Sequence, residues 1–239
     1  NSEMKEDQWV SLFSGGKDSN WALYQALENG FDVKYLLTVH PPAGSYMYHV
    51  PATRVVPFVA ESIGIELIEI EPEFKILGDA DSGEQGDREV ECIENSLIKI
   101  ADEIHLEGVI AGAVESEYQR SRIQKMCDNL NITLYAPLWK SDPLAMVNKM
   151  VEAGFEIMMV SVAADGIDES WLGRYIDMNA IEELQVLNEK YGVHILGEGG
   201  EYETLVTNGP HMNREIKVEY DVFWRGNWGE IKVKNAWLG

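Results

Sequence analysis

The stretch WVSLFSGGKDS at residues 9–19 decides the fold class of this chain. Residues 9–13 are mostly apolar and predict a short buried strand, and the apolar spacing of residues 21–27 predicts a helix that ends near Gly30. Two glycines between a strand and a helix allow a sharp turn, and the N–H groups at a helix N-terminus favour an anion. The stretch therefore predicts a strand–loop–helix unit that binds phosphate.

The residue types within the loop support this interpretation. Lys17 adds a full positive charge, and the hydroxyl groups of Ser14 and Ser19 add hydrogen-bond donors. The spacing is too short for the GxxxxGK[ST] phosphate loop. Ligands of open α/β sheets bind at the carboxyl ends of the strands, where this loop is expected. The alternative interpretation is a tight strand-to-helix turn without a ligand.

Strands and helices alternate along the first part of the chain. Apolar and β-branched runs predict strands at 33–39, 65–70, 108–111 and 132–135, and helical periodicity predicts helices at 52–63, 89–106 and 116–130. Residues 71–87 are acidic and contain glycine, which predicts a loop. Alternating strands and helices predict an α/β fold with a doubly wound, mostly parallel sheet.

The pattern changes beyond residue 137. A helix is expected at 143–153, a strand at 156–162 and a helix at 180–191, with a turn-rich segment between the last two. Alternation of apolar and polar residues within 201–237 predicts antiparallel strands. We therefore predict a nucleotide-binding domain at 1–136 and a smaller α+β, substrate-binding domain at 137–239.

Charge and cysteine content limit the classes of function. The 239 residues include 19 Lys and Arg against 41 Asp and Glu, a net charge of −22. Such a surface repels nucleic acid and anionic membranes, and it also fits salt adaptation. The two cysteines form no CxxC or zinc pattern and are expected to be reduced core thiols. With no membrane span and no signal peptide in the sequence, a cytoplasmic protein is expected.

A second motif, GEGGEYET at residues 197–204, places three carboxylates within six residues. Glu201 and Glu203 share one face if the motif is a strand. Like charges this close repel one another, so a cation such as Mg²⁺ or an ammonium group would relieve them. The structural alternatives are a solvated acidic turn, or carboxylates that accept hydrogen bonds from backbone N–H groups.

The sequence SGGKDS resembles the PP-loop, SGGxDS, of the ATP pyrophosphatase superfamily, whose members release pyrophosphate and form an adenylated intermediate. Together with SYMYH at 45–49, YQRSR at 118–122, APLW at 136–139, DESWLGR at 168–174 and the second motif, the chain resembles the diphthine–ammonia ligase family. It resembles the short archaeal form, because the extra C-terminal domains of larger eukaryotic members are not in the sequence. A glutaminase domain is not in the sequence either, so the resemblance implies free ammonium as the nitrogen source.

The resemblance implies a reaction and a set of site residues. The implied reaction is ATP-dependent amidation of diphthine on elongation factor two by ammonium, through an acyl-adenylate, with ATP as cofactor and Mg²⁺ beside it. Nucleic acid and membranes are not expected as partners, and a homodimer stays open. The implied catalytic residues are Lys17, Asp18, Arg120, Arg174, Glu201 and Glu203, and the implied nucleotide-binding residues are Ser14, Gly15, Gly16, Lys17, Asp18, Ser19, His49 and Gly112.

Further expectations concern individual side chains. Lys17 is expected at an exposed helix entrance, where its loss affects ATP use more than folding. The resemblance also implies a trimethylammonium group on the substrate, for which Tyr118, Trp171 and Tyr202 are expected to offer aromatic faces. Two other functions stay open, namely a tRNA thiolase or other tRNA-modifying enzyme of the PP-loop class, and an adenine-nucleotide-binding module without turnover.

Overall fold

The computed structural model describes residues 6–40, 51–71 and 82–239. Contacts between residues divide them into two compact units. The first unit takes the described residues of 1–14, 22–49 and 65–139, and the second takes those of 15–21, 50–64 and 140–239. Both units are therefore discontinuous in sequence, and the domain boundary expected between residues 136 and 137 stays a prediction.

A five-stranded parallel sheet forms the centre of the first unit, which confirms the predicted α/β class. Its strands lie in the order β3-β2-β1-β4-β5, so that β1 is central and the strand order reverses between β1 and β4. Ligand sites of open α/β sheets lie at such a reversal, beyond the carboxyl ends of the strands. The strands are β1 (Gln8–Leu12), β2 (Val33–Val39), β3 (Glu66–Ile70), β4 (Leu106–Ile110) and β5 (Thr133–Tyr135).

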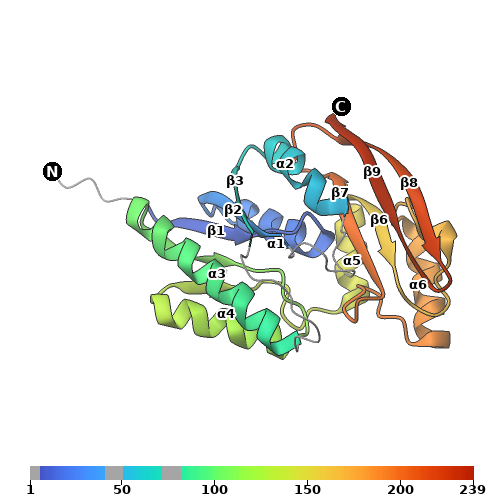
Figure 1. Cartoon of the computed structure of the whole chain (residues 1–239), viewed down its shortest axis with the longest axis horizontal. Helices are drawn as coiled ribbons and strands as arrows, with labels where there is room; N and C mark the ends of the chain where they lie inside the picture. Colours follow the sequence, from blue (N-terminus) through green and yellow to red (C-terminus); the bar gives the residue numbers. More distant parts are fainter. Residues whose placement is uncertain (1–5, 41–50, 72–81) are drawn as a thin grey trace. The chain divides into compact units, whose positions relative to one another are not determined.

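Helices α3 (Ser82–Glu103) and α4 (Glu117–Leu130) pack side by side on one face of this sheet (Figure 1). The core between them and the strands includes Val10, Leu37, Leu97 and Cys127. Helix α3 begins earlier than predicted, so residues 82–87 are helical rather than part of the expected acidic loop.

An antiparallel four-stranded sheet forms the centre of the second unit, as the alternating pattern predicted. Its order is β7-β6-β9-β8, which leaves β7 at one edge. The strands are β6 (Glu156–Val162), β7 (Tyr202–Asn208), β8 (Ile216–Arg225) and β9 (Trp228–Leu238), and the helices of this unit are α2 (Pro51–Ile63), α5 (Pro143–Glu152), the short 3-10 turn η2 (Glu169–Trp171) and α6 (Met178–Tyr191). Helix α1 (Lys17–Glu28) begins in the second unit and ends in the first.

Aspartates cap the N-termini of three of these helices, so part of the acidic excess stabilises local structure. The side chains of Asp142, Asp168 and Asp177 accept hydrogen bonds from backbone N–H groups in the first turns of α5, η2 and α6. Such caps satisfy N–H groups that have no acceptor within the helix. None of the helices within the described ranges combines the length and the hydropathy that a membrane span requires.

The packing around α4 predicts very different reactivity for the two cysteine thiols. Cys127 is fully buried, and burial together with the charge of Asp128 raises its pKa to about 12. Cys92 on α3 is only partly buried, although burial and neighbouring glutamates raise its pKa as well. Since only the thiolate reacts, we expect iodoacetamide at pH 8 to modify Cys92 slowly in the folded protein and to leave Cys127 unmodified.

Peptide mass mapping after alkylation checks this expectation, with the protein in denaturant as the control in which both thiols react. The variant Cys92→Ser isolates the signal of Cys127. Rapid modification of Cys127 under native conditions would mean that α4 does not pack against the sheet as described.

Candidate active site

The edge strand β7 fixes the glycine loop through two hydrogen bonds. The backbone N–H of Val206 donates to the carbonyl of Gly15 at 3.0 Å, and the backbone N–H of Lys17 donates to the hydroxyl of Thr204 at 3.0 Å. Gly15 has a φ of 85°, a conformation that side chains other than hydrogen disfavour. The N–H that β7 would otherwise expose at its outer edge therefore holds the predicted phosphate loop in place.

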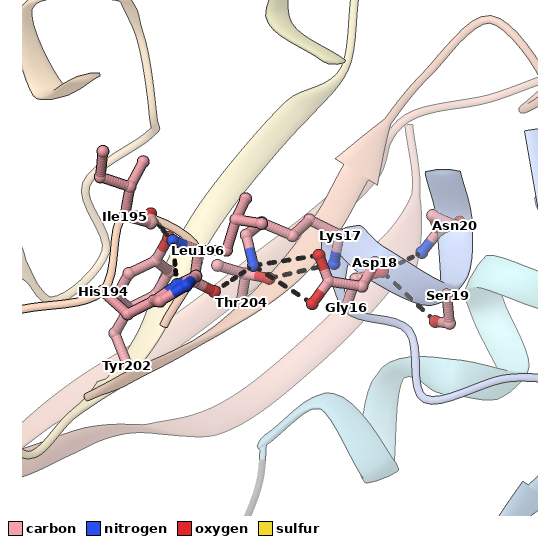
Figure 2. A network of polar contacts seen from close by, with 10 residues as sticks. All are labelled: Gly16, Lys17, Asp18, Ser19, Asn20, His194, Ile195, Leu196, Tyr202 and Thr204. Carbon is pink, nitrogen blue, oxygen red and sulfur yellow. Dashed lines mark hydrogen bonds and ion pairs between the residues drawn. The ribbon is translucent and has the colours of Figure 1, made fainter. Parts of the chain in front are cut away.

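The carbonyl of Gly16 closes the first turn of α1 (Figure 2). It accepts hydrogen bonds from the backbone N–H of Asn20 at 3.2 Å, from the amide of the same side chain at 2.9 Å and from the hydroxyl of Ser19 at 3.3 Å. The carbonyl of a trans peptide points away from the N–H of the same peptide. The Gly16–Lys17 peptide is thus held at both ends, by Asn20 on one side and by Thr204 on the other.

Lys17 is buried, which corrects the expectation of an exposed helix entrance. Only 4% of its surface is accessible, and its ammonium donates to the carbonyl of Leu196 at 2.6 Å. The same group lies 3.2 Å from a carboxylate oxygen of Asp18 and 5.2 Å from the ring centroid of Tyr202 (Figure 2). The sequence could not show this, because the acceptor is a backbone carbonyl from a segment 179 residues away.

The second motif folds into a turn that leads into β7 beside Lys17. One carboxylate oxygen of Glu201 accepts a hydrogen bond from the backbone N–H of His194 at 2.5 Å, and the other is buried and has no hydrogen-bond partner among the described residues. Tyr202 donates its hydroxyl proton to the carbonyl of Ile195. Burial, followed by the charges of Asp18, Glu201 and Glu198, raises the pKa of Tyr202, which keeps this ring neutral.

Glu203 lies within β7 and differs from Glu201 in its surroundings. Its carboxylate accepts a hydrogen bond from the hydroxyl of Ser161 on β6 at 3.4 Å. Burial raises the pKa of Glu203, and the charge of Glu230 adds to the rise while the bond from Ser161 opposes it. The two carboxylates therefore contact different partners: Glu201 contacts the turn before the motif, and Glu203 the neighbouring strand.

The aromatic rings expected to receive a trimethylammonium group are occupied by cations of the chain itself. Lys17 lies over Tyr202, Arg174 lies 4.4 Å from the ring centroid of Trp171, and the guanidinium of Arg122 lies 3.2 Å from that of Tyr118. Trp171 and Tyr202 are also only 6% and 3% exposed. In the described conformation these two rings are buried beside cations of the chain itself, and their expected contact with a substrate cation stays a prediction.

The remaining predicted site residues divide between the two units. Arg174 belongs to the second unit, where it forms an ion pair with Glu183 of α6. In the first unit, Gly112 follows β4, and Arg120 on α4 places its guanidinium 5.0 Å from the ring centroid of Trp139. Ser14 also belongs to the first unit, and His49 lies outside the described residues.

Several residues that fix the site were not predicted individually as site residues, although Thr204 lies in the predicted second motif. They are Asn20, Leu196 and Thr204, which contact the loop directly, and His211, whose Nε2 lies 2.9 Å from the amide oxygen of Asn20. Asn20 had a usable signal, because a polar residue one helical turn after a glycine can bond back to its carbonyl. His211 follows an Asn-Gly-Pro turn and offers no such signal in the sequence.

Potential metal ligands gather at one place in the described ranges, away from the predicted loop residues in sequence. Asp7, His105 and Glu107 present ligand atoms within 4.8 Å of one another, and the side chains are exposed or partly exposed. His105 forms an ion-pair contact with Asp7 at 2.7 Å. Neither Asp18, Glu201 nor Glu203 belongs to such a group, so the described residues show no ready-made Mg²⁺ cage beside Lys17.

A buried lysine, a fixed glycine turn and the start of α1 make the loop suited to an anion. The first-turn N–H groups of a helix have no intrahelical acceptor and carry partial positive charge. An ammonium group has three donors, and the acceptors described for Lys17 account for two of them. The loop, which follows β1 in the chain, therefore has the donor groups that a phosphate site requires, and its assignment to phosphate stays a prediction.

The central strand, the glycine loop and the lysine at the start of α1 define an α/β ATP-binding protein of the PP-loop class. Two family models match the chain, described as the diphthamide synthase N-terminal domain over residues 7–134 and the diphthamide synthase C-terminal domain over residues 142–238. The chain belongs to the diphthine–ammonia ligase family.

Diphthine–ammonia ligases from several organisms are similar over most of this chain. The diphthine–ammonia ligase of Danio rerio is 34% identical over 220 residues, which is 88% of this chain and 86% of that protein. The diphthine–ammonia ligase of Homo sapiens is 30% identical over 221 residues, 88% of this chain and 82% of that protein. The diphthine–ammonia ligase of Schizosaccharomyces pombe is 33% identical over 218 residues, 87% of this chain but only 35% of that longer protein.

The buried position of Lys17 changes the expected effect of its substitution. In Lys17→Met the side chain keeps its length but leaves the carbonyl of Leu196 without its buried donor. An unsatisfied buried acceptor costs about 1–3 kcal/mol, so we expect the free energy of unfolding to fall by that amount. Urea unfolding measures it, with Lys34→Met, an exposed lysine near the Tyr35 ring, as the matched control. Equal stability of both variants would contradict the described contacts.

The environment of His211 predicts a pH dependence of stability. Burial lowers its pKa from 6.5 to about 4. Between these values the unfolded chain binds the proton more readily than the folded one, so stability is lost as the pH falls from about 6.5 towards 4 and is fully present above that window. The contribution amounts to at most about 3 kcal/mol. We expect the free energy of unfolding to fall more across this window in wild type than in His211→Gln. Parallel profiles of unfolding free energy against pH would contradict the burial of His211.

Proposed function

We propose that this chain catalyses the ATP-dependent amidation of diphthine on elongation factor two, with ammonium as the nitrogen source. The observation that carries the proposal is the PP-loop itself, held by β7 at the end of the central strand with Lys17 beside it. Membership of the diphthine–ammonia ligase family supplies the reaction class. The acidic chain, with a net charge of −22, supports a protein substrate rather than RNA.

The chemistry requires two displacements. A carboxylate oxygen of diphthine attacks the α-phosphorus of ATP, and the bond to pyrophosphate breaks. Ammonium loses a proton, its nitrogen attacks the acyl carbon, and AMP leaves with the former carboxylate oxygen while the nitrogen releases a second proton to give the amide. The task of the protein is to align these groups and to stabilise the charge on departing pyrophosphate.

We assign the loop residues to the phosphates of ATP. Gly15, Gly16 and the first turn of α1 would contact phosphate oxygens through N–H groups, and Lys17 would add charge while it stays anchored to Leu196. Mg²⁺ would bind together with ATP through the phosphate oxygens, since this ion usually takes most of its ligands from water and phosphate. Arg120 and Arg174, each stacked on a tryptophan, are proposed to steady phosphate or the substrate carboxylate.

The proposal extends to domain organisation and place of action. The two family matches, which end at 134 and begin at 142, support a boundary near residues 136 and 137. Because the proposed substrate is a translation factor, the proposed compartment is the cytoplasm.

The decisive experiment uses the purified chain, ATP, ammonium and elongation factor two that carries diphthine. We expect AMP and pyrophosphate in equal amounts, and the small mass loss on the factor that marks exchange of a hydroxyl group for an amino group. Pyrophosphate release without that mass loss would mean another acceptor, as in a tRNA-modifying enzyme. If the chain does not cleave ATP at all, the remaining alternative is a nucleotide-binding module without turnover.

Glu201 gives a sharper test of the acidic motif. In Glu201→Gln one amide oxygen can still accept from the N–H of His194, while the charge of the second, buried oxygen is removed. If that charge attracts ammonium or the substrate cation, the KM for one of them should rise about tenfold while ATP binding holds. Glu203→Gln, whose partner is Ser161, serves as the matched variant. Normal turnover of Glu201→Gln with both ammonium and the protein substrate would mean that the motif at 197–204 has a structural role only.

A further inference from the structure

Asn20 connects the phosphate loop to a residue near the end of the second unit. Its side chain is completely buried, and its amide nitrogen donates to the carbonyl of Gly16 at 2.9 Å. The donor role of the nitrogen fixes the orientation of the amide, because the oxygen must then face a different partner. That oxygen faces Nε2 of His211 at 2.9 Å.

This contact determines the tautomer of His211. An amide oxygen can only accept, so Nε2 of the imidazole has to carry the hydrogen. Burial lowers the pKa of His211 to about 4, so the ring is neutral at pH 7 and donates as the Nε2–H tautomer. The result is a directional chain of hydrogen bonds from His211 through Asn20 to the Gly16 carbonyl.

The imidazole is itself held in position. It stacks on Phe155 with a centroid distance of 5.2 Å and an interplanar angle of 21°, and Phe155 contacts Trp21 of α1 edge-on at 5.3 Å. The backbone of Gly209 also approaches the imidazole closely, since a Cβ at this position would lie 2.8 Å from Cε1 of His211. The turn after β7 thus presents the ring to α1 in one orientation.

We propose that His211 is a positioning residue for ATP, which acts through Asn20 to hold the Gly16–Lys17 peptide and the first turn of α1 in the orientation that receives phosphate. The inference rests on the proposed function of the loop. Without the His211 donor, the amide of Asn20 can rotate, and the Gly16 carbonyl loses its closest partner. Ligand binding then has to restore an orientation that the wild type already holds, which weakens affinity.

The test compares variants that keep or remove the donor. His211→Gln places an amide N–H near the position of Nε2, whereas His211→Leu fills the space without a donor. We expect the Kd of ATP, measured by titration calorimetry, and the KM for ATP to rise about fivefold in His211→Leu, the effect of one neutral hydrogen bond. His211→Gln should recover most of the affinity, and the KM for ammonium should stay unchanged in both variants.

Two further variants separate positioning from folding. Gly209→Ala keeps His211 but forces its ring to move, so it should weaken ATP binding in the same direction. His105→Leu, at an exposed histidine of the first unit, is the matched control and should leave the Kd of ATP unchanged. A role in folding alone would lower the melting temperature and the active fraction but not change the affinity of the folded molecules for ATP.

The outcomes distinguish this inference from the proposed function. Wild-type affinity for ATP in folded His211→Leu and Gly209→Ala would overturn the positioning role and leave the ligase proposal standing. If His211→Leu does not fold, wild-type affinity in Gly209→Ala alone overturns it. ATP binding by wild type without cleavage would overturn the ligase proposal, while the calorimetric comparison would still decide the role of His211. Failure of wild type to bind ATP would overturn both.

Discussion

The edge of β7 is the constraint on which the phosphate loop depends. An edge strand exposes N–H groups that need acceptors, and a glycine turn exposes carbonyls that need donors. Here the N–H of Val206 and the carbonyl of Gly15 satisfy one another, and the hydroxyl of Thr204 takes the neighbouring N–H of Lys17. A backbone that would otherwise sample many conformations is thereby fixed by residues almost two hundred positions later in the chain.

The acidic motif belongs to the same arrangement. Its turn supplies the carbonyl of Leu196 to the ammonium of Lys17, its Tyr202 ring lies beside that ammonium, and its Thr204 begins the contact with the loop. Glu201 accepts a hydrogen bond from the turn before the motif, and Glu203 accepts one from the neighbouring strand β6. The motif therefore has a structural role in holding the loop, and the second oxygen of Glu201, buried without a described partner, is the part that this role does not explain.

Local patterns in the sequence predicted most of the fold. Strands 33–39 and 156–162 have the predicted bounds, α5 begins at residue 143 as predicted, and α6 begins at Met178 rather than at the predicted residue 180, since Asp177 caps it. These features depend on periodicity and on side chains a few residues apart. The burial of Lys17 and the contact between Asn20 and His211 were not predictable, because each depends on a partner that only the tertiary structure brings near. The helical start of α3 was missed since its glycines favour a loop.

A net charge of −22 opposes the binding of anions at long range, but the magnitudes separate this effect from the local contacts of the loop. Two unit charges 20 Å apart in water interact by only about 0.2 kcal/mol, and salt at physiological strength screens them over about 8 Å. A charge-assisted hydrogen bond in a buried site contributes about 1.5–3 kcal/mol. Under the proposed function, retention of ATP would therefore be decided by Lys17 and a few N–H groups, whereas surface charge would act mainly on encounter. A nucleic acid, whose binding sums many exposed phosphate contacts, has no comparable compensation. An acidic surface is thus physically compatible with the nucleotide proposed for the loop, and the expectation that it disfavours RNA stays a prediction.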